Sequence, residues 1–219
     1  MNMIKGCFLG FSLLIGASAN AAIINFDFTG DSQNRIYDTL SFSSGGYTLN
    51  VTARTRITAT AQDGSKTVTN QDSKVEWWRE GLGVVTEGNA DNRLNSDTSI
   101  DEKLLFTLTS AGDPAAKFTW IEVFFGTRNS SRLETGETAE IRFGSPESEY
   151  FVRGPLSSYV IDDLSKAWNK FNLESSERNI DDNGFRVKGV SIDVPAPSTS
   201  AILGLGLLAL GMRRFKKAA

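Results

Sequence analysis

The sequence predicts an all-β protein, an antiparallel β-sandwich of the jelly-roll kind, flanked by an N-terminal signal helix and a C-terminal hydrophobic helix. Three observations lead to this prediction. Short segments with alternating apolar and polar residues recur along the centre of the chain, turn residues separate them, and only one central segment has helical apolar spacing. A period of two is typical of strands with one buried face. Many short strands with turns between them favour a sandwich.

Several strands are predicted in the first half of the centre. Residues 24–28 place Ile, Phe and Phe at alternate positions, and residues 47–53 alternate in the same way before a threonine-rich continuation to residue 60. Threonine is β-branched and fits the pleated surface of a sheet. The pair Asp63-Gly64 predicts a hairpin turn that returns the chain as a strand at 66–69.

Further strands are predicted at residues 75–79, 100–108, 118–125, 137–143 and 150–152. Residues 118–125 are apolar on both faces apart from Thr119 and Glu122, which predicts a strand covered on two sides. Residues 162–171 predict a short helix, because Leu164, Trp168 and Phe171 fall on one helical face.

The last predicted strand, at residues 185–194, changes its pattern part of the way along. Phe185 and Val187 share one face, whereas Val190 and Ile192 follow the other parity. A β-bulge adds one residue to a strand. The apolar side chains after it then point to the same face of the sheet as those before it. We therefore expect a bulge at Gly189.

Both ends of the chain differ from the centre. Residues 1–21 have one base, an apolar core and small residues at the end, which is the pattern of a secretory signal peptide. Cleavage is expected after Ala21, with Ala19 as the alternative. Residues 22–194 then form one β-sandwich domain, and residues 195–219 form a tail.

The composition of the chain excludes several classes of function. The sequence has no histidine, so His-based catalytic triads and His metal sites are excluded. Its one cysteine, Cys7, lies in the signal peptide, so the mature domain has no disulfide. Without the basic residues of the two ends, the centre carries a net charge of about −8. Such a domain repels the phosphates of nucleic acids.

The tail has three parts. A short motif is followed by an apolar run at residues 201–212 and by a basic end made of Arg213, Arg214, Lys216 and Lys217. The strictly apolar run is shorter than the roughly 20 residues of a typical membrane-spanning helix, and the uncharged residues before it lengthen it. The basic end is expected to stay on the cytoplasmic side of the membrane.

The tail resembles the PEP-CTERM sorting signal of Gram-negative bacteria, also known as the ice-binding protein C-terminal domain. The motif that carries the resemblance consists of Val194, Pro195, Ala196, Pro197, Ser198 and Thr199. Ala196 stands where the family usually has glutamate. The resemblance implies processing by a membrane-embedded exosortase and delivery to the cell envelope, cell surface or extracellular matrix. The alternative is an ordinary C-terminal membrane anchor.

One polar loop is a candidate calcium site. Calcium prefers oxygen ligands from carboxylates, amides and carbonyls. Such groups are dense between residues 87 and 102, where the candidate ligands are Asp91, Asn92, Asp97, Asp101 and Glu102. The alternative is that Asp, Asn and Gly simply build turns here.

Two adjacent tryptophans, Trp77 and Trp78, are the candidate ligand-binding residues. Neighbouring side chains of a strand point to opposite faces, so one ring is expected in the core and the other can present a flat surface to a sugar. The alternative is that a loop covers the second ring.

No catalytic motif is present, since the sequence has no nucleophile elbow, P-loop or metalloprotease signature. We therefore expect a non-enzymatic exported protein with a structural or carbohydrate-binding role, whose partners are an exosortase-type enzyme, the membrane and extracellular polysaccharide. A secreted polysaccharide hydrolase is one alternative, because any two suitably spaced carboxylates can cleave glycosides. A membrane-anchored periplasmic protein is the other.

Overall fold

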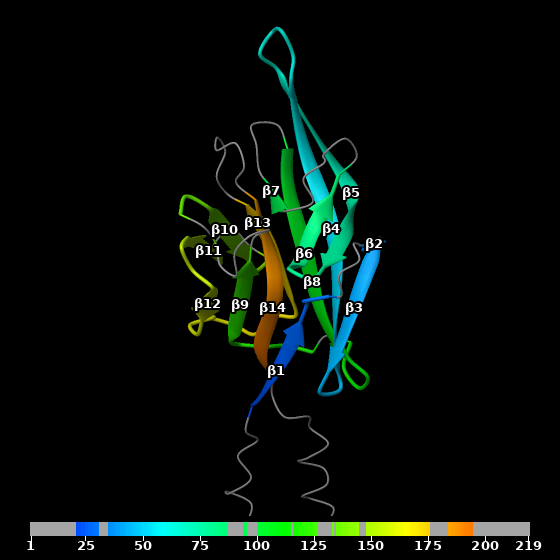
Figure 1. The fold of residues 1–219 in the computed structure, drawn as a ribbon, viewed down its shortest axis with the longest axis vertical. Coiled ribbons are helices and arrows are strands. Elements are labelled where there is room, and N and C mark those ends of the chain that lie inside the picture. Colours follow the sequence, from blue (N-terminus) through cyan, green and yellow to red (C-terminus); the bar gives the residue numbers. More distant parts are fainter. Residues whose placement is uncertain are drawn as a thin grey trace, which may run out of the picture. The chain divides into compact units, whose positions relative to one another are not determined.

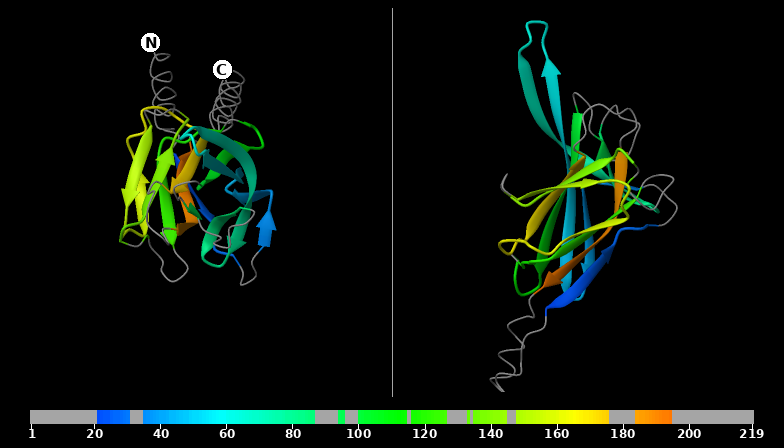
Figure 2. Two further views of the ribbon diagram at one scale, coloured as in Figure 1. Left: turned by 90° about the horizontal axis from the view of Figure 1, so that it is seen from above. Right: turned by 90° about the vertical axis from the view of Figure 1, so that its left-hand side faces the viewer.

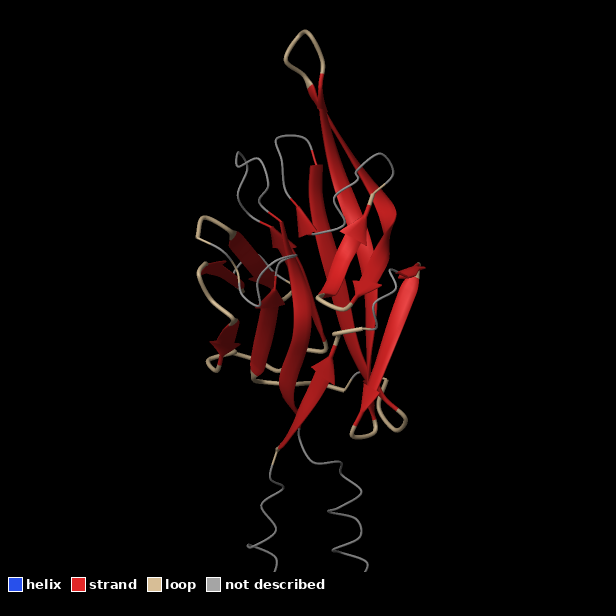
Figure 3. Ribbon diagram, viewed as in Figure 1, coloured by secondary structure: helices blue, strands red, loops and turns tan. Residues whose placement is uncertain are grey.

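A computed structural model of the chain describes residues 21–30, 35–86, 94–95, 100–114, 116–126, 133, 135–144, 148–175 and 184–194. Within these ranges every regular element is a strand (Figure 3). The strands are β1 (Ala22–Asp27), β2 (Arg35–Tyr37), β3 (Thr39–Ser44), β4 (Tyr47–Thr60), β5 (Lys66–Trp78), β6 (Gly81–Val85), β7 (Leu94–Asn95), β8 (Ile100–Ser110), β9 (Ile121–Gly126), β10 (Thr138–Arg142), β11 (Glu149–Arg153), β12 (Ser158–Ile161), β13 (Lys170–Ser175) and β14 (Gly184–Val194). The prediction of an all-β fold is confirmed.

The domain, Ile23–Asp193, is built from one continuous antiparallel sheet. Its strands follow the order β11-β10-β13-β8-β4-β5-β6-β14-β9-β12. β5 joins two layers, because its first part pairs with β4 and its last residues, from Lys74 to Trp78, pair with β6. We call β3, β4, β8, β10, β11 and β13 the first layer, and β1, β6, β9, β12 and β14 the second layer (Figure 1). The curved sheet is nearly barrel-shaped (Figure 2).

Phenylalanine rings fill the space between the layers. Phe106 and Phe171 stack with their centroids 4.5 Å apart, and Phe118 meets Phe171 edge to face at 5.9 Å. All three rings are buried. Burial of such rings supplies much of the hydrophobic stabilisation of a core. These residues come from separate segments, so the core holds the sheet in its curved form.

The predicted helix at 162–171 is wrong. Trp168 instead forms an isolated bridge with Phe118, and β13 begins at Lys170. Phe171 and Leu173 alternate into the core, while β13 pairs with β8 and β10. The helical spacing of Leu164, Trp168 and Phe171 was a weak local signal, and pairing with two neighbouring strands outweighs it.

The strand predicted at 118–125 begins later, at Ile121. The carboxylate of Asp193 accepts hydrogen bonds from the amides of Thr119 and Trp120 and from the Thr119 hydroxyl, at 2.6 to 2.8 Å. These bonds satisfy the backbone where it leaves the ladder. Asp193 thereby fixes the entry into β9.

The predicted bulge at Gly189 is confirmed. β14 pairs with β9 with a register shift between Val187 and Gly189, since Val187 lies opposite Phe125 and Gly189 lies opposite Phe124. Val190 and Ile192 then point into the core, as Val187 does. The extra residue keeps apolar side chains inside on both sides of the shift.

The described residues contain no helix that is long and apolar enough to cross a membrane. The two predicted flanking helices lie outside the described residues.

Candidate functional site

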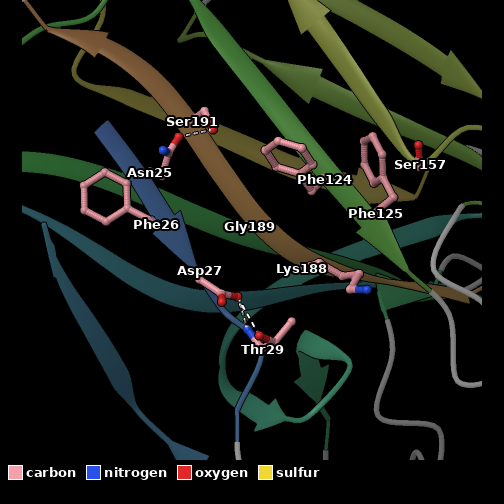
Figure 4. Close-up of a pocket in the computed structure, with 10 residues that line it drawn as sticks. All are labelled: Asn25, Phe26, Asp27, Thr29, Phe124, Phe125, Ser157, Lys188, Gly189 and Ser191. Carbon is pink, nitrogen blue, oxygen red and sulfur yellow. Dashed lines mark hydrogen bonds between the residues drawn. The ribbon is translucent and has the colours of Figure 1, made fainter. Parts of the chain in front are cut away.

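A groove of about 480 Å³ lies where β1, β14 and β9 run side by side on the outer face of the second layer (Figure 4). We call it the β14 groove. It is lined by Asn25, Phe26, Asp27, Thr29, Phe124, Phe125, Ser157, Lys188, Gly189 and Ser191. Its volume falls within the range of about 300 to 1,000 Å³ that is typical of small-ligand sites. This volume makes the groove a candidate binding site, and its lining includes aromatic as well as polar residues.

Gly189 lets the backbone of β1 pack closely against β14 at the centre of the groove. A Cβ atom on this residue would lie 2.8 Å from the carbonyl oxygen of Phe26 and 3.7 Å from Cδ2 of Phe124. The first distance is too short for any side chain, so the position of the β1 backbone requires glycine here. The bulge in β14 therefore lies between the backbone of β1 and an aromatic ring.

Phe124 is the aromatic residue of the groove that faces outward. It is half-buried, whereas its neighbours Val123 and Phe125 are buried in the core. Pairing with Ser158 of β12 and Gly189 of β14 fixes its backbone on both sides. The backbone that carries the ring is thus held by both neighbouring strands.

Two polar side chains of β1 are positioned by short hydrogen bonds. The Asn25 side-chain oxygen accepts a bond of 2.6 Å from the Ser191 hydroxyl. One Asp27 oxygen accepts bonds from the Thr29 amide at 2.8 Å and from its hydroxyl at 2.7 Å. The amide nitrogen of Asn25 and the second oxygen of Asp27 form no hydrogen bond to any described residue. These two groups are available to a ligand.

Lys188 adds the only positive charge to the groove lining. Its side chain is half-buried, and its ammonium group has no ion-pair partner in the described part of the chain. Its backbone oxygen accepts a 2.8 Å bond from the amide of Phe28, which fixes the strand position. Lys188 can donate hydrogen bonds to oxygen atoms of a ligand.

Trp77 is held between strands rather than free. Its indole nitrogen donates a 2.8 Å hydrogen bond to the carbonyl of Phe28. Its ring meets Phe42 edge to face at 5.6 Å and lies 6.4 Å from Tyr37. The residue is half-buried. These contacts link β5 to the residue that follows β1, to β2 and to β3.

Trp78 lies among positive charges. The guanidinium carbon of Arg186 is 5.2 Å from the ring centroid, and that of Arg79 is 5.6 Å away. Arg186 and Glu76 form a buried ion pair. Trp78 is half-buried beside this pair, so cation–π contacts occupy part of its surface. The sugar-binding role of Trp77 and Trp78 stays a prediction.

Three of the candidate calcium ligands, Asp91, Asn92 and Asp97, lie outside the described residues. The other two are adjacent in β8, so their side chains point to opposite faces. Glu102 is buried and accepts a 2.6 Å bond from the Thr86 hydroxyl, whereas Asp101 is half-buried. No cluster of three or more candidate ligands is found in the described ranges.

A second group of charges lies on the outer face of the first layer. Arg142 forms ion pairs with Glu140, with Glu174 at 2.8 Å and with Glu149 at 3.3 Å. Glu140 lies directly opposite Glu174 across β10 and β13. Burial raises the pKa of Glu174, and the positive charges of Arg142 and Lys103 oppose that rise. This group contains the acidic pair that a hydrolase would need, but each carboxylate is bound to one arginine.

Sequence reasoning missed the β14 groove. Asn25 and Asp27 were visible as the polar positions of an alternating strand, and Gly189 was visible as a bulge. Nothing in the sequence shows that β1 and β9 flank this bulge, because the three strands are far apart along the chain.

Residues 193–216 match the family model of the PEP-CTERM protein-sorting motif. The predicted resemblance is therefore confirmed: the chain carries this motif, which indicates exosortase-dependent sorting to the cell surface in Gram-negative bacteria. Comparisons with curated proteins and with solved structures found no significant match.

Of the predicted terminal site residues, the structure describes only Ala21 and Val194, the last residue of β14. Ala19, the motif from Pro195 to Thr199, and the four residues of the basic end lie outside the described residues.

Proposed function

We propose that the domain is a non-enzymatic, jelly-roll-like β-sandwich that binds polysaccharide at the cell surface or in the extracellular matrix. In this proposal the tail delivers the protein and the β14 groove holds a segment of the polymer. The observation that carries the proposal is the half-buried Phe124 ring in the lining of the groove, with polar groups around it.

This combination suits a sugar ring. A pyranose has one face of C–H groups, which can lie on an aromatic ring, and a rim of hydroxyl groups, which need hydrogen-bond partners. Phe124 provides the ring. The Asn25 amide nitrogen and the Lys188 ammonium are donors, and the free Asp27 oxygen is an acceptor.

The absence of a catalytic role is part of the same proposal. Two nearby carboxylates that work on glycosides act as an acid and a base or nucleophile. Glu140 and Glu174 lie opposite each other across β10 and β13, and both are tied to Arg142. In the groove itself Asp27 is the only carboxylate of the lining. A single carboxylate supports binding better than hydrolysis.

Retention on the extracellular polysaccharide of the producing cell tests the proposal. Phe124→Ala should reduce affinity about tenfold, which corresponds to about 1.4 kcal/mol. The matched control is Phe151→Ala, since Phe151 is 57% exposed on β11 of the other layer. The control should bind as the original protein does. Equal retention of both variants and the original protein would contradict the proposal.

Calcium binding by the loop between residues 87 and 102 is a separate and smaller proposal. Its support is the density of oxygen-bearing side chains there. A ligand that binds only the native state raises the melting temperature. We expect a higher melting temperature in millimolar calcium than in a chelator; identical values would remove the site.

A further inference from the structure

The hairpin of β4 and β5 extends beyond the rest of the domain (Figures 1 and 2). β8 pairs with β4 only as far as Ile57, opposite Ile100. On the other side of the hairpin, β6 pairs with β5 only from Lys74 onward. From Lys66 to Ser73, therefore, β5 pairs with β4 along one edge and with no described strand along the other. We call this second edge the open edge.

We infer that the open edge pairs with the open edge of a second copy of this chain, so that the two hairpins form one antiparallel ribbon. An exposed strand edge presents unpaired amide and carbonyl groups and is a template for another strand. The open edge contains no proline, and its residues are exposed except for Gln71 and Ser73, which are half-buried. This inference does not depend on the proposed function.

The hydrogen-bond pattern shows which groups face outward. At the tip of the hairpin the amide of Ala61 bonds to the carbonyl of Ser65 at 2.8 Å. Bonded and non-bonded pairs alternate along an antiparallel ladder. The pair of Thr60 and Lys66 is consequently non-bonded toward β4. The backbone groups of Lys66, Val68, Asn70 and Asp72 therefore point to the open edge.

Charge selects one register for the two copies. With Thr69 of each copy on the twofold axis, Lys66 of one copy lies opposite Asp72 of the other, and Val68 lies opposite Asn70. The backbone amide and carbonyl groups of these four residues point to the open edge. Each pair is therefore a hydrogen-bonded pair between the two copies. A shift of two residues in one direction would oppose Lys66 and Lys74, and Lys74 is already paired with Val85 of β6. A shift of two residues in the other direction would place Lys66 opposite Asn70 and lose both pairs of Lys66 with Asp72.

The charged residues are free to make this contact. The Asp72 side chain is 91% exposed, and its one contact is a 3.4 Å ion pair with Arg54. Lys66 is exposed and has no ion pair with any described residue. In the dimer the second copy's Lys66 would join Arg54 at Asp72. Opposite charges at a strand edge fix register and partner choice more than they add affinity.

The register can be tested by a single cysteine. The only natural cysteine is Cys7, in the predicted signal peptide. Thr69→Cys places two thiols in a non-bonded pair across the axis, where Cα atoms are about 4.5 Å apart and a disulfide fits. Thr67→Cys is the matched control, because its two copies would be about 13 Å apart, four residues along the strand.

The exported protein, expressed from the full gene and recovered from the envelope, is oxidised gently and run on a non-reducing gel. Thr69→Cys should become mostly disulfide-linked dimer, and Thr67→Cys should remain mostly monomer. Equal cross-linking of the two variants, or none in either, would overturn the inference.

Charge exchange gives a second readout that needs no cysteine. Asp72→Lys or Lys66→Asp alone sets like charges opposite each other twice in the dimer, and should weaken dimerisation about tenfold in sedimentation equilibrium. The double variant restores opposite charges and should restore the dimer. A monomeric original protein, or a double variant as weak as the single ones, would contradict the inference.

Discussion

On the outer face of the first layer one arginine is shared by three glutamates, whereas on the second layer a buried arginine is paired with one glutamate. The nearby Lys188 forms no ion pair with any described residue. Arg142 is 39% exposed, and Arg186 and Glu76 are 3% and 0% exposed. Both groups point away from the core, because their strand neighbours Ile141 and Val187 point into it. The group around Arg142 is thus net negative, whereas Arg186 and Lys188 on the second layer are balanced by Glu76 and Asp27.

This difference explains why binding is assigned to the second layer. Three carboxylates surround Arg142, so they occupy the hydrogen-bond donors of its guanidinium and leave a net negative charge on that face. On the second layer Glu76 and Arg186 are buried and paired with each other. The polar groups of the β14 groove remain available to a ligand. The buried pair supports the strand that presents Lys188, and it is not itself exposed to a ligand.

The largest expected effect comes from breaking the buried pair. Arg186→Met removes the guanidinium from Glu76 and from the face of Trp78, and leaves a buried carboxylate without that partner. Removing one partner of a buried ion pair typically costs about 3 to 5 kcal/mol. We expect a loss of about 3 kcal/mol in the free energy of unfolding, measured by urea denaturation.

The double variant Glu76→Leu with Arg186→Met is the control for this experiment. Because it removes both charges, it should recover much of the loss. A loss below about 1 kcal/mol for the single variant would show that the pair on the second layer is no more important than an exposed one.

A smaller effect is expected on the first layer, and it depends on pH. Burial raises the pKa of Glu174 above its usual value of 4.5. The folded protein therefore binds more protons than the unfolded chain between that value and the raised pKa, so this residue's contribution to stability falls as the pH rises through that window. The melting temperature of Glu174→Gln minus that of the original protein should thus increase from pH 4 to pH 7.

Glu149→Gln removes another partner of Arg142 and controls for the loss of an ion pair alone. A difference for Glu174→Gln that shrinks as the pH rises would contradict the assigned direction of the pKa shift.

The local pattern of the sequence was enough to predict much of the fold but not the groove. Alternation predicted β1, β4 and β14, and the change of parity at Gly189 predicted the bulge, because these signals lie within single strands. The helix at 162–171 failed because the position of β13 is decided by pairing with β8 and β10, which are distant in sequence. The groove depends in the same way on which strands flank β14.

The sorting motif is the opposite case. It is read from consecutive residues, so the sequence was sufficient to recognise it, and the family match at 193–216 agrees. The polysaccharide site was sought at Trp77 and Trp78 because aromatic pairs stand out in a sequence. Phe124 did not stand out, since its place in the groove depends on the pairing of β9 with β14, where it lies opposite Gly189.

Mapping the bound oligosaccharide on the domain by NMR tests the central claim most directly. Titration with fragments of the extracellular polysaccharide should shift the backbone amides of β1 from Asn25 to Asp27, of β14 from Lys188 to Ser191, and of Phe124. Shifts centred on Trp77 and Trp78, on the first layer around Arg142, or on no single region would contradict the assignment of the β14 groove as the binding site.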